Sequence, residues 1–333
     1  MSLQQIPRVA GLSREEFYTN YVEQNRPVVL EDAASDWPAI SKWTSEYLAR
    51  SGGDQVVQLW SIDPRKPPAH SYLRAESTLR EYIARLPDAA RGDPYLAEQP
   101  LKNLFPDLLA DVGPMRYSRS HPSSLSIMLS SRSVAALHYH PHLEAISHQI
   151  AGTRHFILFP PTETSRLDPG PVMSPLWNFG RRVIKEDEIE SMREEVFETT
   201  LTAGEAIFIP LHWWHTVFAG AGLSILVCDF FEYPHARPPQ SEISVRVEQM
   251  HAACRESIAA CEASLQRVSG VEDKTPYFEH IISCCRAIND KKKEQQVLIA
   301  ALSALPETAG RRREIQSRLD ELASRSCGQL PEP

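Results

Sequence analysis

The sequence of 333 residues predicts a mainly β fold with helical flanks. Residues 115–238 consist of short apolar or alternating runs separated by glycine, proline and polar residues, which is typical of antiparallel strands in a sandwich or barrel. Residues 1–114 mix helical and strand patterns, and residues 239–333 show helical periodicity. We therefore expect an N-terminal α/β flank that packs on the barrel, then the barrel core, then a C-terminal helical region.

The N-terminal flank is expected to alternate helices with strands. Ser13 is followed three residues later by Glu16, which is the spacing of a capping box and predicts the start of a helix. The apolar run over 26–30 predicts a buried strand. Further along, the pattern predicts a turn and a helix ending at glycine over 37–53, a strand over 55–60 and a helix over 79–86.

The barrel region contains five runs that are apolar or alternate in polarity and that end at turn residues. These predicted strands cover residues 125–129, 148–150, 155–159, 206–209 and 224–228. All the candidate ligands described below lie in this region.

The C-terminal region is expected to be helical, because apolar side chains recur there every three or four positions. The first helix should bury one stripe, made of Ile243, Val247, Met250, Cys254, Ile258, Cys261 and Leu265. Further helices are predicted over 276–289, 293–304 and 311–325. The basic runs 291–293 and 311–313 are interpreted as solvated helix surface.

Composition limits the partners and the location of the protein. Lys and Arg number 35 against 43 Asp and Glu, a formal charge of -8, which argues against a nucleic-acid partner held by a general electrostatic field. No apolar run approaches the roughly 20 residues that cross a bilayer, and the first residues lack the layout of a signal peptide. None of the six cysteines belongs to a CxxC pair, which gives disulfides or structural zinc little support. We expect a cytoplasmic protein without membrane contacts.

The most informative feature is a group of ligand-type side chains in the barrel region. His138 and His140 stand two positions apart, so on a strand both point to the same face. His215 follows a distant apolar run and offers a third ligand from another strand. Three ligands of this kind leave coordination positions open, which suits a divalent iron that binds both a substrate and oxygen. The sequence therefore predicts a metal site at these histidines.

The surrounding motifs resemble those of the cupin-like JmjC oxygenases over about residues 5–235. The motifs are Pro27-Val28-Val29-Leu30, Trp37-Pro38, Lys42-Trp43-Thr44, Leu137-His138-Tyr139-His140, Gln149-Ile150-Ala151-Gly152, Phe156-Ile157-Leu158-Phe159-Pro160-Pro161, Ala203-Gly204-Glu205-Ala206-Ile207-Phe208-Ile209-Pro210 and Trp213-Trp214-His215. The resemblance implies a double-stranded β-helix, the jelly roll of cupin and JmjC proteins, and an iron(II)- and 2-oxoglutarate-dependent hydroxylase. It also implies a protein side chain or a small molecule as substrate. Related oxygenases dimerise through C-terminal helices, so a homodimer is a further expectation.

Carried over to this chain, the first and last iron histidines of the family fall on His138 and His215. The intervening ligand, Asp or Glu in the family, falls on His140, and a neutral imidazole there raises the charge of the site by one. A second interpretation follows the cupin set of three histidines and one glutamate, in which Glu144 is a fourth ligand and restores the negative charge. His142 continues the alternation of His140 and is an alternative to it. The sequence leaves this choice open.

The cosubstrate pocket also departs from the family. Many relatives place a lysine where this chain has Arg154, and that lysine pairs with the distal carboxylate of 2-oxoglutarate. Arginine clamps a carboxylate with two hydrogen bonds, so the resemblance assigns Arg154 to 2-oxoglutarate. Relatives often carry asparagine where this chain has Cys228.

Three functions are compatible with these residues. The leading one is an iron(II)- and 2-oxoglutarate-dependent dioxygenase that hydroxylates its substrate. The second is a cupin-type metal dioxygenase that uses Glu144 and no 2-oxoglutarate. The third is a non-catalytic JmjC-like binding module, which loss of the acidic ligand supports and retention of the flanking histidines opposes. The sequence does not distinguish a protein side chain, a tRNA base or a small metabolite as substrate.

Overall fold

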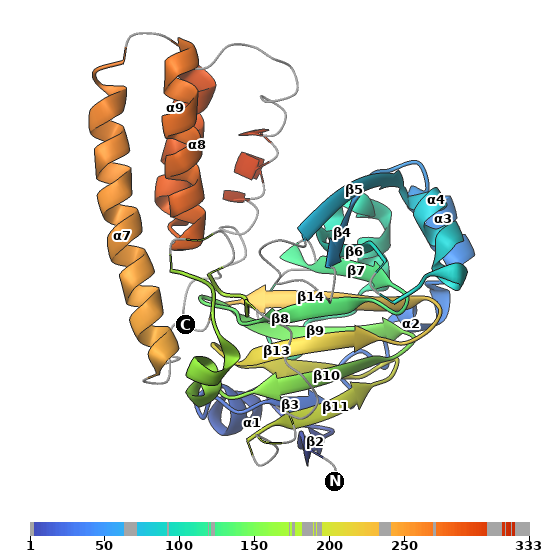
Figure 1. Ribbon diagram of the computed structural model, residues 1–333. Coiled ribbons are helices and arrows are strands. Elements are labelled where there is room, and N and C mark those ends of the chain that lie inside the picture. The colour runs from blue at the N-terminus through green and yellow to red at the C-terminus, as the bar shows by residue number, and fades with distance from the viewer. Residues whose placement is uncertain are drawn as a thin grey trace. The chain divides into compact units, whose positions relative to one another are not determined.

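A computed structural model of the chain contains two compact units, residues 1–243 and residues 244–333 (Figure 1). The described residues are 3–62, 72–91, 93–118, 120, 124–172, 174, 177–181, 189, 191, 195–232, 241–268, 271–304, 315–316, 318–320 and 322–323.

The first unit is built on two β-sheets. The five-stranded sheet has the order β1 (Gln4–Gln5), β11 (Phe197–Leu201), β10 (Arg154–Phe159), β13 (Trp214–Ala219), β8 (Val134–His138). The nine-stranded sheet has the order β2 (Arg8–Val9), β3 (Val28–Leu30), β12 (Ala206–Ile209), β9 (Glu144–Ala151), β14 (Ser224–Phe231), β7 (Ser126–Ser130), β6 (Tyr95–Pro100), β4 (Val56–Ile62), β5 (Tyr72–Thr78). The pairs β1–β11 and β2–β3 are parallel, and the other pairs are antiparallel.

The strands from β7 to β14 divide evenly between the two sheets. β7, β9, β12 and β14 belong to the nine-stranded sheet, and β8, β10, β11 and β13 belong to the five-stranded sheet. A chain that passes back and forth between two four-stranded layers in this way forms a jelly roll. The predicted mainly β fold with helical flanks is therefore confirmed (Figure 1).

A buried cluster of side chains from both sheets defines the inner faces of the strands. Phe156 and Leu158 of β10 lie two positions apart and therefore point the same way. They share the cluster with Val217 of β13 and with Leu226 and Cys228 of β14. Strand positions in phase with these residues thus face the space between the sheets.

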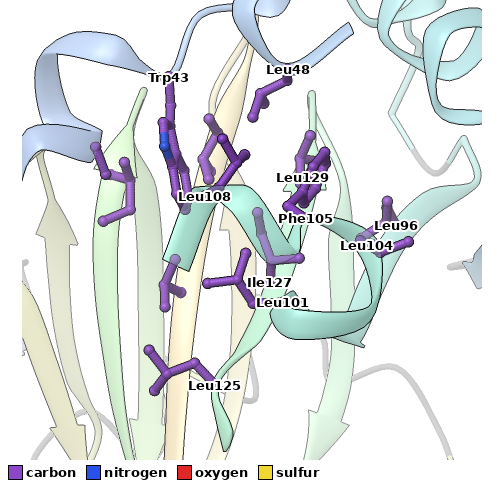
Figure 2. Close-up of a cluster of buried hydrophobic side chains, with 14 of the residues drawn as sticks. Trp43, Leu48, Leu96, Leu101, Leu104, Phe105, Leu108, Leu125, Ile127 and Leu129 are labelled. Atoms are coloured by element: carbon purple, nitrogen blue, oxygen red, sulfur yellow. The ribbon is translucent and has the colours of Figure 1, made fainter. Parts of the chain in front are cut away.

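The opposite face of the nine-stranded sheet is covered by helical segments. Ile127 and Leu129 of β7 pack there against Leu104, Phe105 and Leu108, which Figure 2 shows lying across the strands. Leu104 ends α5 (Leu101–Leu104), Leu108 lies in the following 3-10 helix (Pro106–Asp111), and Phe105 stands between the two. The covering helices fix the sheet and leave its inner face to the functional residues.

Capping explains where the N-terminal helices begin. The predicted capping box is present, because Ser13 Oγ accepts the Glu16 N–H at 3.2 Å and the Glu16 carboxylate accepts the Ser13 N–H at 2.9 Å. The helix that follows is α1 (Arg14–Phe17), which continues as a π-helical turn (Tyr18–Val22). The helix predicted over 79–86 is α4 (Leu79–Arg85), also with a capping box.

The prediction of a turn and a single helix over 37–53 was wrong in one respect. The chain forms two helices there, α2 (Pro38–Lys42) and α3 (Ser45–Gly52). Pro38 suits the first turn of α2, and Thr44 starts α3 anew because its side chain accepts the Tyr47 N–H. Strands β1, β2, β5, β6 and β11 were not among the predicted strands.

The second unit is helical in its described part, as predicted. It contains α8 (Val271–Ala287), α9 (Lys291–Ala304) and all but the first residues of α7 (Glu242–Leu265). The predicted stripe of α7 is buried at Met250, Cys254 and Ile258. Helix α8 begins earlier than predicted, with Pro276 inside it. The predicted helix over 311–325 lies largely outside the described residues.

None of the described helices is both long enough and apolar enough to span a membrane.

Candidate metal centre

Three histidines converge in the first unit. His138 is the last residue of β8 and lies directly opposite His215 of β13 in the antiparallel ladder, so both side chains project from the same face. His140 follows two residues beyond the end of β8. The ring centroid of His138 lies 4.1 Å from that of His215 and 5.4 Å from that of His140. One ligand atom from each histidine lies within 4.8 Å of the others, a group that could hold a metal ion.

The backbone orients two of these rings. His138 Nδ1 lies 2.8 Å from the Ala136 carbonyl oxygen, and His215 Nδ1 lies 3.1 Å from the Trp213 carbonyl oxygen. In the tautomer that donates to these carbonyls, Nδ1 carries the proton and Nε2 keeps a free lone pair. Histidines that ligate metals are commonly oriented by a second hydrogen bond of this type.

The electrostatics of the group favour neutral, metal-ligating imidazoles. Burial, together with the neighbouring His138, lowers the pKa of His140 to about 3. Burial also lowers the pKa of His138, and it lowers the pKa of His215 well below its usual value. All three rings are therefore uncharged at neutral pH, the form that binds a divalent transition metal. The donor set of three imidazoles fits iron(II).

Glu144 is not among the side chains whose ligand atoms converge on this group. It is the first residue of β9, and its Oε2 accepts the backbone N–H of Leu211 at 2.6 Å. The side chain is 2% exposed, and desolvation raises the pKa of its carboxyl to about 8. In this position Glu144 supports the turn that leads into β13.

The neighbouring histidines also lie outside the converging group. The ring of His142 lies 6.4 Å from that of Trp177. His212 has a left-handed backbone with φ 70°, and its N–H donates to the His140 carbonyl at 3.3 Å. His148 is buried with its ring stacked 4.7 Å from that of Trp37. Of these, His212 bears most directly on the site, because it fixes the backbone of His140.

Arg154 lies in the same inter-sheet space as the histidines. On β10, Leu158 is opposite His215 and Arg154 is four residues away, in phase with Leu158 and therefore on the inner face. The separation along the strand is about 13 Å. A long arginine side chain and a five-carbon dicarboxylate together span such a gap.

The guanidinium of Arg154 is buried without an acidic partner among the described residues. Its Nε donates to Ser224 Oγ at 3.1 Å and its Nη2 to Ser130 Oγ at 2.9 Å, while the residue is only 3% exposed. Desolvation lowers its pKa. A buried cation held only by neutral hydroxyls is costly, and a bound anion would offset that cost.

Several residues around Arg154 were not singled out from the sequence. Ser130 and Ser224 hold the guanidinium, and Tyr82 and Tyr95 interact with it electrostatically. Burial raises the pKa of Tyr95 to about 12, so its hydroxyl stays protonated. The available signal was the pattern of β7, where polar Ser126 and Ser130 alternate with apolar residues of the covered face.

Comparison with known proteins identifies relatives of this arrangement. A family model described as "Cupin-like domain" matches residues 13–237. The chain is 28% identical over 278 residues to "Arginine-specific demethylase JMJ22" of Arabidopsis thaliana, covering 76% of this chain and 53% of that protein. It is 28% identical over 233 residues to "Lysine-specific demethylase 8" of Xenopus tropicalis, covering 64% of this chain and 50% of that protein.

A third relative belongs to a different branch. The chain is 25% identical over 248 residues to "tRNA wybutosine-synthesizing protein 5" of Homo sapiens, covering 66% of this chain and 76% of that protein. The chain thus spans about half the length of the two demethylases and about three quarters of the tRNA-modifying protein.

Proposed function

Because this chain belongs to the cupin-like domain family, as its motifs predicted, we propose that it is an iron(II)- and 2-oxoglutarate-dependent oxygenase. His138, His140 and His215 hold the iron, and Arg154 binds the distal carboxylate of 2-oxoglutarate. The observation that carries the proposal is the joint occurrence, on the inner faces of one jelly roll, of three converging neutral imidazoles and a buried guanidinium that has no acidic partner among the described residues.

The residues of this chain would bind, orient and shield the cofactors. When bound, iron(II) and 2-oxoglutarate supply the chemistry that inserts one oxygen atom of O₂ into a substrate C–H bond, while 2-oxoglutarate becomes succinate and CO₂. The Ala136 and Trp213 carbonyls keep the metal-facing nitrogens of two histidines unprotonated. Apolar rings enclose the site, since Phe179 stacks 5.2 Å from His138 and Phe230 lies 5.2 Å from His140.

The missing acidic ligand is compatible with this chemistry. Three neutral imidazoles leave both positive charges of a divalent metal uncompensated, whereas an Asp or Glu ligand would neutralise one of them. A 2-oxoglutarate dianion would bring one carboxylate to the metal and the other to Arg154. The three-histidine set is therefore expected to bind this dianion at least as strongly as a set with one carboxylate.

The relatives indicate the kind of substrate. Two of them are named as demethylases of arginine or lysine, and the third as a tRNA-modifying protein. We propose that this chain hydroxylates a protein side chain or a small molecule.

The test is iron-dependent release of succinate by the purified protein. His138→Ala and His215→Ala are each expected to abolish it. His155→Ala is the matched control, because this histidine lies on β10 beside Glu198 and is partly exposed away from the centre. Succinate release that persists in both ligand variants would refute the proposal.

A non-catalytic binding module is the second candidate, and the presence of His140 in place of an acidic ligand is the observation in its favour. The two candidates differ in metal content. An oxygenase retains about one iron per chain after anaerobic loading and dialysis, whereas a module freed from catalysis need not. A chain that retains iron without 2-oxoglutarate binding would instead favour the cupin-type dioxygenase.

A further inference from the structure

A distortion in β6 marks Glu98 as a residue with a function. Leu96 pairs with Leu129 of β7 and Gln99 pairs with Ile127, so three steps on β6 correspond to two on β7. Glu98 lies in this bulge with φ 38°, a left-handed conformation that glutamate rarely adopts. Bulges re-aim side chains next to active sites, and strained backbone is retained mainly where the position of a side chain matters.

Glu98 shares two neighbours with Arg154 of the candidate site. Glu98 interacts electrostatically with Tyr95 and with Cys228, and Arg154 interacts with the same two residues. Cys228 is an inner-face residue of β14. Two residues on, Phe230 points the same way and contacts the ring of His140. Glu98 therefore lies near Tyr95 and Cys228, two residues that also neighbour the proposed cosubstrate anchor.

The carboxyl of Glu98 is reachable but unsatisfied. The residue is exposed, and yet desolvation raises its pKa, a combination expected of a group that faces a recessed opening rather than open solvent. No hydrogen bond or ion pair joins it to the other described residues. A carboxyl in such a place complements a ligand that brings a positive charge and N–H donors.

Glu98 and Arg154 approach the same neighbours without pairing with each other. Ser130 and Ser224 hold the guanidinium of Arg154. If the two opposite charges formed an ion pair, neither would be available to a ligand. Because the two groups are not paired with each other, Arg154 can bind an anionic cosubstrate while Glu98 binds a cationic group of the substrate.

We propose that Glu98 determines specificity by binding a positively charged substrate group, the amine or guanidinium of a protein side chain. The inference rests on the proposed function. A protein side chain is favoured over RNA, because both this carboxylate and the net charge of -8 repel a phosphate backbone.

The experiment compares four peptides of one glycine–serine background that carry lysine, arginine, norleucine or citrulline at the centre. Binding to the full-length protein, loaded with manganese(II) and 2-oxoglutarate to prevent turnover, is measured by calorimetry. The wild-type protein should bind arginine over citrulline, and lysine over norleucine, by about tenfold or more, as expected for a desolvated charge pair. Glu98→Gln should reduce both ratios to about one, while Glu98→Asp should retain a preference for the cations.

Glu15→Gln is the matched control, because it removes the same charge from the exposed first turn of α1 and should leave both ratios unchanged. Thermal unfolding verifies that each variant is folded. The inference is overturned if wild type shows no cation preference, if Glu98→Gln keeps that preference, or if an unmodified tRNA transcript binds more tightly than the cationic peptides. A preceding titration of the manganese-loaded protein with 2-oxoglutarate tests the proposed function itself, which absence of binding would refute.

Discussion

Replacing Arg154 by methionine separates the structural cost of this residue from its role in binding. The substitution removes two hydrogen bonds to serine hydroxyls, worth about 1.5–3 kcal/mol each for a charged donor. It also removes a buried, unpaired charge whose desolvation costs several kcal/mol. Because the two effects oppose each other, we expect the free energy of unfolding without cosubstrate to change by no more than about 2 kcal/mol.

The response to 2-oxoglutarate should differ sharply between the two proteins. At a concentration about 100 times its Kd, a ligand that binds only the native state stabilises it by about 2.7 kcal/mol, which raises Tm by roughly 5–11 °C in a unit of this size. The manganese-loaded wild-type protein should show this shift, and Arg154→Met should lose it. The assay is thermal unfolding with a titration of 2-oxoglutarate.

Arg166→Met is the control, since this arginine forms an i,i+3 ion pair with Glu163 and is half exposed. It should keep the full 2-oxoglutarate shift and change stability by about 0.5 kcal/mol or less. A normal shift in Arg154→Met, or a loss of several kcal/mol without ligand, would contradict the assignment of Arg154 as an anion site.

Three further predictions concern single residues. Burial lowers the pKa of His148 to about 4, so below pH 6.5 the unfolded chain binds a proton at this residue that the native state does not bind. His148 alone should therefore remove about 2 kcal/mol of stability between pH 6.5 and 5, and urea unfolding of His148→Phe should show a loss smaller by about that amount. Burial raises the pKa of Glu144 to about 8, so its carboxyl is mostly protonated at neutral pH. Glu144→Gln should keep one metal per chain by elemental analysis, and a loss of metal with an unchanged free energy of unfolding would contradict the exclusion of Glu144 from the ligands. Gly152 has φ +68°, and an added Cβ would lie 2.6 Å from the Leu223 carbonyl oxygen, so Gly152→Ala should lower the free energy of unfolding in urea by about 2 kcal/mol or more. The control is Gly222→Ala, where φ is +82° and no atom lies within 4 Å of the added Cβ, and it should lower that free energy by about 1 kcal/mol. Equal losses in the two variants would contradict this steric reasoning.

The sequence predicted those parts of the site that depend on local periodicity. Two-residue spacing singled out His138 and His140, and the structure brings both beside His215. The same alternation did not decide the position of Glu144, because β8 ends at His138 and the chain turns before β9 begins. Strand parity holds only while the ladder continues, so a residue beyond the turn has no fixed phase relative to the histidines.

Contacts between distant strands could not be predicted in this way. The hydroxyls that hold Arg154 come from β7 and β14, about 24 residues before it and 70 after it. The sequence around a serine does not indicate which distant residue its hydroxyl will contact. Strand β6 was missed for a related reason. Its bulge at Glu98 breaks the alternation of apolar and polar residues, and this alternation is the pattern by which strands are predicted.

The charges of the candidate site support one another only when its ligands are bound. A divalent metal and Arg154 bring three positive charges. 2-Oxoglutarate brings two negative charges, and an ionised Glu98 brings a third negative charge. In the absence of metal, desolvation favours the neutral form of Glu98, as its raised pKa reflects. Binding of a metal or of a cationic group nearby should lower that pKa, because a neighbouring cation favours the ionised form. The two cations repel each other directly, whereas each favours the ionised carboxylate that attracts the other, so binding of the metal and binding of a cationic substrate should be coupled through Glu98.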